Sequence, residues 1–181
     1  HGAGAPLGGE IDPELVQQTK LQIRSIIQEI AGLSQRAISP EEYFSGFLTQ
    51  VVSALAAEGG AIWFVGDEGA LELQHQVNLP RKAIVEDKAG ALQHRLLLQK
   101  TLAEGQPTLA PPRSGAVGAD DAGNPTESLL VLAPLRQGEE CIGLVEIFQR
   151  AGGGPTTQRG FLRFLAQIAD LAGEYLRNRH L

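Results

Sequence analysis

The chain has 181 residues, 43% of them hydrophobic, and this length and composition predict one compact domain and exclude a chain that is disordered throughout. Fifteen Lys and Arg against twenty-one Asp and Glu leave a net charge of −6, which argues against a nucleic-acid binder because such proteins need a basic face. The single cysteine excludes an internal disulfide and a cysteine-based zinc site, and it suits a reducing compartment.

The N-terminal residues are set apart by their composition. Residues 1–11 hold four glycines among alanines and a proline, which is typical of a flexible linker or a tag remnant, and we expect residues 12–181 to form a single domain. Because the sequence contains no methionine, we expect it to be one module of a longer protein. The longest apolar run, residues 129–135, is about a third of what a membrane-spanning helix needs.

Two helices are predicted before the first strand. Asp12 and Pro13 supply an N-cap and a first helical residue, and the apolar residues after them repeat in alternating steps of three and four, with Thr19 filling one gap. These seam residues are Val16, Ile23, Ile26, Ile30 and Leu33. Ser39 and Glu42 have the spacing of a capping box, which predicts a second helix that begins after Ser39 and is stopped by Gly59 and Gly60.

The period of the pattern then changes from helical to two. Residues 61–65 are a continuous apolar run and residues 67–69 a turn, which together predict the first half of a hairpin. The returning strand alternates strictly, so we expect one face in the core and one face in water. The residues of its apolar phase are Leu71, Leu73, His75, Val77 and Leu79.

A third helix is predicted over residues 91–104 and a short strand over residues 107–110. The segment that follows, residues 111–125, contains three glycines and no apolar periodicity. A loop of this length is typically a lid, a binding loop or a disordered segment.

A second hairpin and a final helix complete the pattern. Residues 128–135 and 141–148 are predicted strands joined by a turn, and we expect Thr156 or Thr157 to cap the last helix after a glycine-rich break. Hairpins instead of crossovers predict an α+β fold: a central antiparallel sheet of about five to six strands with helices packed on it, and the terminal helices together on one face.

Four stretches, in this order and spacing, carry a resemblance to a known family. A helix and hairpin over residues 39–69 are followed by residues 102–107, which fit the pattern a-x-x-G-x-P. A hairpin pattern, v-P-L followed by G and then by i-G-v, fits residues 132–135, Gly138 and residues 142–146. The closing helix also matches in place and length. The arrangement resembles the GAF domain, a small-molecule-sensing module of signalling proteins, and implies a GAF/PAS-like fold over nearly the whole chain.

Several branches of that family have defined chemistry, and the sequence departs from each. Bilin-binding relatives use a cysteine in a loop or helix, whereas Cys141 lies in a predicted core strand, where we expect a small buried hydrophobe. Methionine-sulfoxide-reducing relatives use several cysteines. The dispersed Asn-Lys-Phe-Asp-Glu signature of cyclic-nucleotide-binding relatives is not traceable here. Haem-binding relatives need an axial histidine, for which His75 and His94 are the internal candidates.

Four residues are candidates for ligand binding. His75 lies in the apolar phase of a strand and would reach a pocket, unless it is a partly buried edge histidine with one backbone partner. His94 and Arg95 lie on the helix that covers the ligand cavity in GAF domains, where Arg95 could pair with an anionic ligand unless that face is solvated. Arg113 is a lid residue or a mobile surface arginine.

Metal binding and catalysis are not predicted. Asp120, Asp121 and Asn124 offer oxygen ligands, but they lack the alternating positions, glycine and distant glutamate of a calcium loop. The two glutamates that precede Cys141 disfavour a reactive thiolate. An enzyme that uses a lone histidine and loop acids is therefore the least favoured function.

The terminal helices predict a homodimer. Beside its core stripe the last helix has a second apolar line, which must be buried against a partner. In GAF-containing signalling chains such helices pair across a dimer and pass ligand-dependent shifts to an output domain. We expect this line and the seam of the first helix to form the interface; the alternative is that the two helices pack on each other within one protomer. The interface residues expected from the second line are Leu162, Ala169 and Leu176.

The function predicted from the sequence is a regulatory, non-enzymatic module that binds an unidentified small molecule and signals to a downstream output domain of the same chain. The alternative is an interaction module of a larger signalling or membrane-anchored secretion-adaptor protein, with its pocket filled by its own side chains. We expect a cytoplasmic location, no nucleic-acid partner, no evident cofactor and no membrane insertion by this segment. Arg177 and Arg179 end the last helix without a Gly or Asn stop, so we expect it to continue into a connector.

Overall fold

The computed structural model describes residues 13–79, 88–115 and 121–179, apart from the side chains of residues 13–19. The elements in chain order are α1 (Pro13–Ser34), α2 (Pro40–Ala54), β1 (Gly59–Val65), β2 (Leu71–Val77), α4 (Lys88–Glu104), β3 (Thr108–Ala110), β4 (Leu129–Gln137), β5 (Glu140–Gln149) and α5 (Pro155–Arg179). The predicted linker over residues 1–11, the N-cap at Asp12 and the side chain of Val16 lie outside the described part.

The strands form one antiparallel sheet in the order β2-β1-β5-β4-β3. The two predicted hairpins supply four of these strands, and β1 pairs with β5 to join the hairpins. The short strand β3 extends the sheet at the edge of β4. The α+β class, the element order and the five-stranded antiparallel sheet agree with the prediction, and β5 is the central strand.

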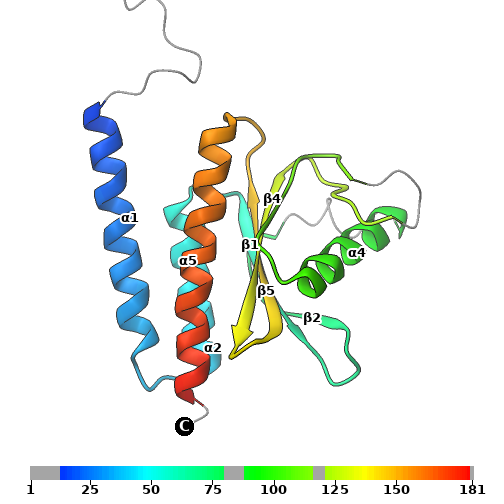
Figure 1. The fold of residues 1–181 in the computed structure, drawn as a ribbon, viewed down its shortest axis with the longest axis horizontal. Coiled ribbons are helices and arrows are strands. Elements are labelled where there is room, and N and C mark those ends of the chain that lie inside the picture. The colour runs from blue at the N-terminus through cyan, green and yellow to red at the C-terminus, as the bar shows by residue number, and fades with distance from the viewer. Residues whose placement is uncertain (1–12, 80–87, 116–120, 180–181) are drawn as a thin grey trace, which may run out of the picture.

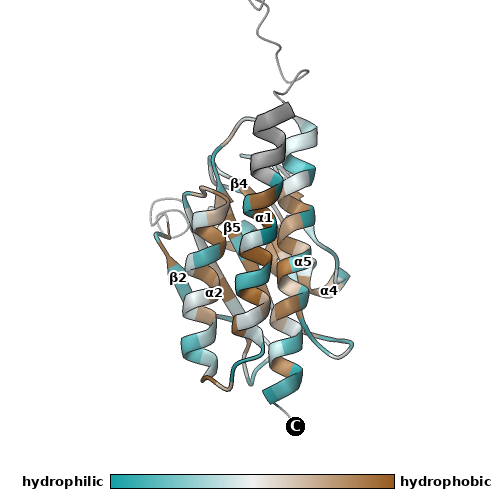
Figure 2. Ribbon diagram, turned by 90° about the vertical axis from the view of Figure 1, so that its left-hand side faces the viewer, coloured by the Kyte–Doolittle hydropathy of each residue, from teal (hydrophilic) through white to brown (hydrophobic). Residues whose placement is uncertain are grey.

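Helices cover both faces of the sheet, but unequally (Figure 1). On one face α2 and α5 pack against the strands, and α1 lies outside them in contact with both. On the other face α4 is the helix that packs against β4 and β5. The terminal helices α1 and α5 therefore lie on one side, as the sequence predicted, and Figure 2 views this three-helix layer from outside.

Side-chain alternation along β4 and β5 divides the core into two parts. Val145 and Ile147 belong to the larger part, under α2 and α5, whereas Leu144 and Phe148 belong to the smaller part, under α4. The same alternation in β4 sends Leu130 and Leu132 to the α4 side. Because successive residues of a strand point to opposite faces, the side chains on the two faces of the central strand pack under different helices.

The predicted alternation of β2 is interrupted by a bulge. His75 pairs with Ile62, but the next pair joins Leu73 to Trp63, so one residue of β2 is left over. An extra residue reverses the side to which the following side chains point. Leu71 accordingly packs in the cluster under α4, while Val77 packs in the core under α2. The expectation of a single apolar face on this strand is therefore wrong.

The helix starts agree with the sequence at α2 and differ at α5. The Ser39 hydroxyl oxygen accepts a hydrogen bond from the backbone N–H of Glu42 at 3.2 Å, as a capping box requires. Helix α5 begins at Pro155, so Thr156 and Thr157 lie inside the first turn and neither is the cap. Gly59 and Gly60, expected to end α2, are the first residues of β1.

Two tyrosines join α1, α2 and α5 at one end of the helical layer. The rings of Tyr43 and Tyr175 are stacked, with centroids 3.9 Å apart and planes 3° from parallel. Ser34 donates to the carbonyl of Ile30 at 2.7 Å, so the Tyr43 hydroxyl, 2.7 Å from the Ser34 oxygen, is the donor of that second bond. Burial raises the pKa of Tyr43 to about 12, and the Tyr175 hydroxyl donates to the Ile38 carbonyl.

Candidate functional site

A buried carboxylate lies in the middle of the apolar sheet face under α4. Glu146 is on the central strand β5, where it pairs with Ala61 of β1 and Leu132 of β4. Its side chain points to the same face as those of Leu144 and Phe148, which belong to the α4-side cluster, and it is 0% exposed. A charged group in such a place needs hydrogen-bond partners, because an unpaired buried charge is very costly.

Two ring nitrogens supply those partners. The Trp63 Nε1–H donates to Oε1 of Glu146 at 2.9 Å, and Nε2 of His94 lies 2.6 Å from Oε2. An ionised carboxylate only accepts hydrogen bonds, so Nε2 of His94 is the donor when Glu146 is ionised. The two rings are themselves in contact, with centroids 6.0 Å apart. We call His94, Glu146 and Trp63 the buried polar cluster.

The local structure explains how each member reaches the cluster. His94 belongs to the buried stripe of α4, whose members follow helical spacing: Gly90, His94, Leu97, Leu98 and Thr101. Trp63 follows the bulge in the pairing of β1 with β2 and pairs with Leu144 on its other side. Trp63 remains half-buried, whereas His94 is 2% exposed. The cluster therefore joins α4 to the two strands at the centre of the sheet.

The charge of Glu146 decides the protonation of His94. Burial by itself would lower the pKa of the His94 imidazole, but the negative carboxylate of Glu146 and its hydrogen bond outweigh burial and raise the pKa above its ordinary value. The pair, with N···O at 2.6 Å, is an ion pair whenever the imidazole is protonated. The cluster can therefore gain or lose a charge in the pH range near neutrality.

This raised pKa predicts that the domain loses stability as the pH rises. The folded state holds the His94 proton more tightly than the unfolded state, so the stabilisation is complete below about pH 6.5 and disappears as the pH passes the folded-state pKa. Urea unfolding between pH 6 and 9 should show a decline no steeper than about 1.4 kcal/mol per pH unit, the limit for one proton.

His94→Gln is the matched variant for this experiment, and its unfolding free energy should stay level from about pH 7 to pH 9. Burial lowers the pKa of His75, so His75 reduces the free energy of unfolding only as the pH falls below about 6.5. A decline of stability at alkaline pH is therefore due to His94. An alkaline decline of the same size in His94→Gln would assign the effect to another group.

Comparison with known families decides the class of the chain. The family profile described as "GAF domain" matches residues 39–178, which is more than half of the sequence. The chain belongs to the GAF domain family. GAF domains are commonly sensory or regulatory parts of signalling proteins.

Solved structures share the fold at low sequence identity. The A. aeolicus nlh2 GAF domain in an inactive state has a TM-score of 0.68 and 19% identity, with 89% of this chain and 99% of that chain covered. The free methionine-R-sulfoxide reductase of Neisseria meningitidis, in complex with its substrate, has a TM-score of 0.67 and 13% identity over 97% and 98% of the two chains. The GAF domain of a phosphoenolpyruvate-protein phosphotransferase from Coxiella burnetii has a TM-score of 0.62 and 15% identity over 88% and 96%. No curated protein matched the chain.

The four predicted ligand-binding residues of this GAF domain do not form one site. His94 is buried in the polar cluster, while its neighbour Arg95 is exposed. His75 is half-buried on the opposite side of the sheet, where its ring lies 5.9 Å from that of Phe44 on α2. Arg113 is exposed, and its backbone N–H donates to the Thr126 carbonyl.

Asn124, considered above as an oxygen ligand, holds the ends of the long loop together. Its side-chain amide donates to the carbonyls of Ala110, Pro111 and Ser128 at 2.8 to 2.9 Å, and its oxygen accepts from Thr126. All its polar atoms are therefore used within the chain. Asp120 lies outside the described residues, among which no group of three His, Cys, Asp or Glu side chains could hold a metal ion.

The predicted dimer residues lie at different depths. Ile30 and Ala169 are buried in the core of the protomer, and Ile26, Leu33, Leu162 and Leu176 are partly buried against that core. Ile23 is 38% exposed, and Leu21 beside it is 53% exposed. All six side chains from residue 20 to residue 25 are exposed, so this half of α1 is not covered by the rest of the protomer.

The sequence contained a signal for two residues that the prediction missed. Glu146 stands between Leu144 and Phe148 on the same phase of a strand, and a carboxylate in an apolar phase is as unusual as the histidine noticed at position 75. Trp63, the single tryptophan, lies in a buried strand, where an indole N–H needs an acceptor. The partners could not be foreseen because 52 residues separate His94 from Glu146 and 83 separate Trp63 from Glu146.

Proposed function

We propose that this GAF domain is a regulatory module that senses a small molecule on the α4 side of its sheet, with the buried polar cluster as the group that responds. The observation that supports this proposal is the position of Glu146. It is a fully buried carboxylate, held by Trp63 and His94 within an otherwise apolar layer.

The energetics favour a role other than stability. Removing two charges from water costs several kcal/mol per ion, and replacement of a buried ion pair by apolar residues of similar volume is often neutral or stabilising. Leu98, Leu132 and Leu144 belong to the apolar cluster on this side of the sheet, and an apolar side chain at position 146 would have extended that cluster. A titratable pair in that place gives the domain two states of different charge, which a ligand or a proton can select.

A thermal-shift screen with nucleotides, haem and aromatic metabolites tests the ligand. A ligand at about 100 times its Kd should add roughly 2.7 kcal/mol to the unfolding free energy. Glu146→Gln, which keeps the shape of the side chain and removes its charge, should reduce that gain for the same compound. Stabilisation that is identical in the wild type and in Glu146→Gln would place the ligand away from the cluster.

A second candidate function is an interaction module that binds no small molecule. The side chains of this chain itself occupy much of the α4 side of the sheet, where Leu97, Leu98 and Phe148 are buried. A self-filled layer of this kind needs no ligand to be stable. The absence of any stabilising compound in the screen would favour this second function.

The proposed role is non-enzymatic. Cys141, the single cysteine, is half-buried near the start of β5, so the expectation of a small buried hydrophobe is wrong. It follows the exposed pair Glu139 and Glu140, and acidic neighbours disfavour the thiolate form that a redox or nucleophilic reaction needs. The polar cluster consists of a carboxylate, an imidazole and an indole, and none of its members is a hydroxyl or a thiol.

Dimerisation through the terminal helices and an output domain in the same chain are part of the proposal. Leu21 and Ile23 on α1 support it, because they are among the large apolar side chains that the described structure leaves exposed. Apolar residues on an uncovered helix are typical of interaction surfaces. Among the described residues, no helix is both long enough and apolar enough to cross a lipid bilayer.

Light scattering at high micromolar concentration should report a dimer for the wild type. Leu21→Glu with Ile23→Glu should give a monomer that keeps its fold, because these two side chains carry little of the protomer core. The matched control is Val65→Glu with Leu73→Glu, two exposed apolar residues of the first hairpin, which should remain dimeric. A monomeric wild type, or equal effects of the two pairs, would refute this interface.

A further inference from the structure

Helix α4 ends at a glycine that is held by an arginine from the sheet. The Gly105 N–H donates to the Thr101 carbonyl, and Gly105 has a φ of +66°, which is the left-handed conformation of a helix C-terminus. The Gly105 carbonyl then accepts a hydrogen bond from Nη2 of Arg136 at 2.5 Å. A Cβ atom at Gly105 would lie 2.9 Å from the same nitrogen, so the guanidinium rests directly against the end of α4.

The backbone of the same arginine touches α5. Arg136 lies near the end of β4, at the point where the pairing of β4 with β5 shifts its register. A Cβ atom at Gly173 of α5 would lie 2.9 Å from the Arg136 carbonyl oxygen, a distance that real side chains do not tolerate. Helix α5 therefore approaches the strand so closely that glycine is required at position 173.

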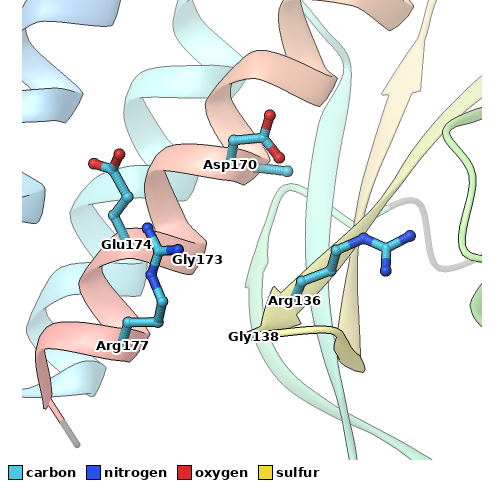
Figure 3. Close-up of a pocket in the computed structure, with 7 residues that line it drawn as sticks. Arg136, Gly138, Asp170, Gly173, Glu174 and Arg177 are labelled. Atoms are coloured by element: carbon cyan, nitrogen blue, oxygen red, sulfur yellow. The ribbon is translucent and has the colours of Figure 1, made fainter.

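These two contacts point in opposite directions from one residue. In Figure 3 the side chain of Arg136 extends away from α5, whose residues Asp170 and Gly173 lie on the other side of the Arg136 backbone. Helices α4 and α5 cover opposite faces of the sheet (Figure 1). Arg136 is thus a direct link, through its side chain and its carbonyl, between the helix that carries His94 and the C-terminal helix.

A surface pocket lies beside the link. Its volume is about 190 Å³, and it opens between the end of β4 and the last turns of α5 (Figure 3). The residues that line it are Arg136, Gly138, Ala169, Asp170, Gly173, Glu174 and Arg177. Asp170 and Arg177 are exposed, so the pocket is a surface feature that borders the close contact between Gly173 and Arg136.

We propose that Arg136 is a positioning residue that couples α4 to α5, so that a change at the buried polar cluster alters the packing of the C-terminal helix. The proposal rests on the proposed regulatory function, but it concerns the coupling inside the domain and needs no ligand. Coupling between sites is carried by packed elements that have two arrangements, and Arg136 contacts an element on each face.

Hydrogen exchange measures this coupling. In the wild-type background, His94→Gln should change the exchange rates of α5 amides 169–176 by about threefold or more, within the range that residues between two sites produce. Rates are taken relative to α2 amides 44–52 in the same sample, so that a change in global stability cancels. In an Arg136→Ala background the same His94→Gln change should leave the α5-to-α2 ratio unaltered.

Two further backgrounds make the result specific. Arg136→Lys keeps the positive charge but not the forked donor geometry, and the α5 response should be intermediate. Arg150→Ala removes an exposed arginine that follows β5, and the response should stay at the wild-type value. An α5 response that survives in Arg136→Ala, or that is absent in the wild-type background, would overturn the proposal. Either result is independent of whether any compound binds.

Discussion

Glu146→Ala should destabilise the domain by about 3–5 kcal/mol, the cost typical of removing one partner of a buried ion pair. The substitution leaves the Trp63 Nε1–H and the His94 imidazole without the carboxylate that accepts both of their hydrogen bonds. It also opens a cavity beneath α4, which adds to the loss. Urea unfolding at pH 7 measures the difference.

Two controls separate charge from packing in that result. Glu146→Gln keeps the side-chain volume and one acceptor oxygen, so the loss should be no more than half of that in Glu146→Ala. The double substitution His94→Leu with Glu146→Leu removes both charges, and it should recover most of the stability because the surrounding layer is apolar. If the double variant is as unstable as Glu146→Ala, the cluster exists for stability and the functional interpretation fails.

Tyr175→Ala should cost about 3–5 kcal/mol, the range for removing a large aromatic side chain from a core. Tyr175 is fully buried, its ring stacks on Tyr43, and its hydroxyl donates to the Ile38 carbonyl between α1 and α2. The loss should release the C-terminal end of α5 from the other two helices. Thermal unfolding of the variant measures it.

Tyr175→Phe is the matched control for this second prediction. It keeps the stacked ring and removes the hydrogen bond to Ile38, so the expected loss is about 0.5–2 kcal/mol. Equal losses in the alanine and phenylalanine variants would mean that the hydrogen bond, and not the ring packing, holds α5 in place.

The parts of the fold that the sequence predicted are those fixed by local chemistry. The Ser39 cap, the turn after residue 65 and the two hairpins depend on residues a few positions apart. The start of α5 was predicted wrongly, although its signal was local too. Proline favours the first position of a helix, so α5 begins at Pro155 and the two threonines after it lie inside the first turn.

The parts that the sequence did not predict depend on distant partners. The bulge opposite Ile62 and Trp63 follows from how two strands fit together, and nothing in β2 alone marks the extra residue. The buried polar cluster likewise unites three elements. The fold therefore separates candidate residues chosen by type, such as His75 and Arg113, whereas the partners of Glu146 are evident only from its contacts.

The most direct test of the proposed sensing role uses the single tryptophan. Trp63 gives one indole N–H signal in a ¹H–¹⁵N spectrum, and this proton is the one donated to Glu146. On titration with the nucleotides, haem and aromatic metabolites of the thermal-shift screen, a compound that the domain senses should move this signal in a saturable way, and Glu146→Gln should weaken the shift. If every compound leaves the indole signal unmoved, or if shifts occur only at amides of α1 and α5, the polar cluster is not the sensing site.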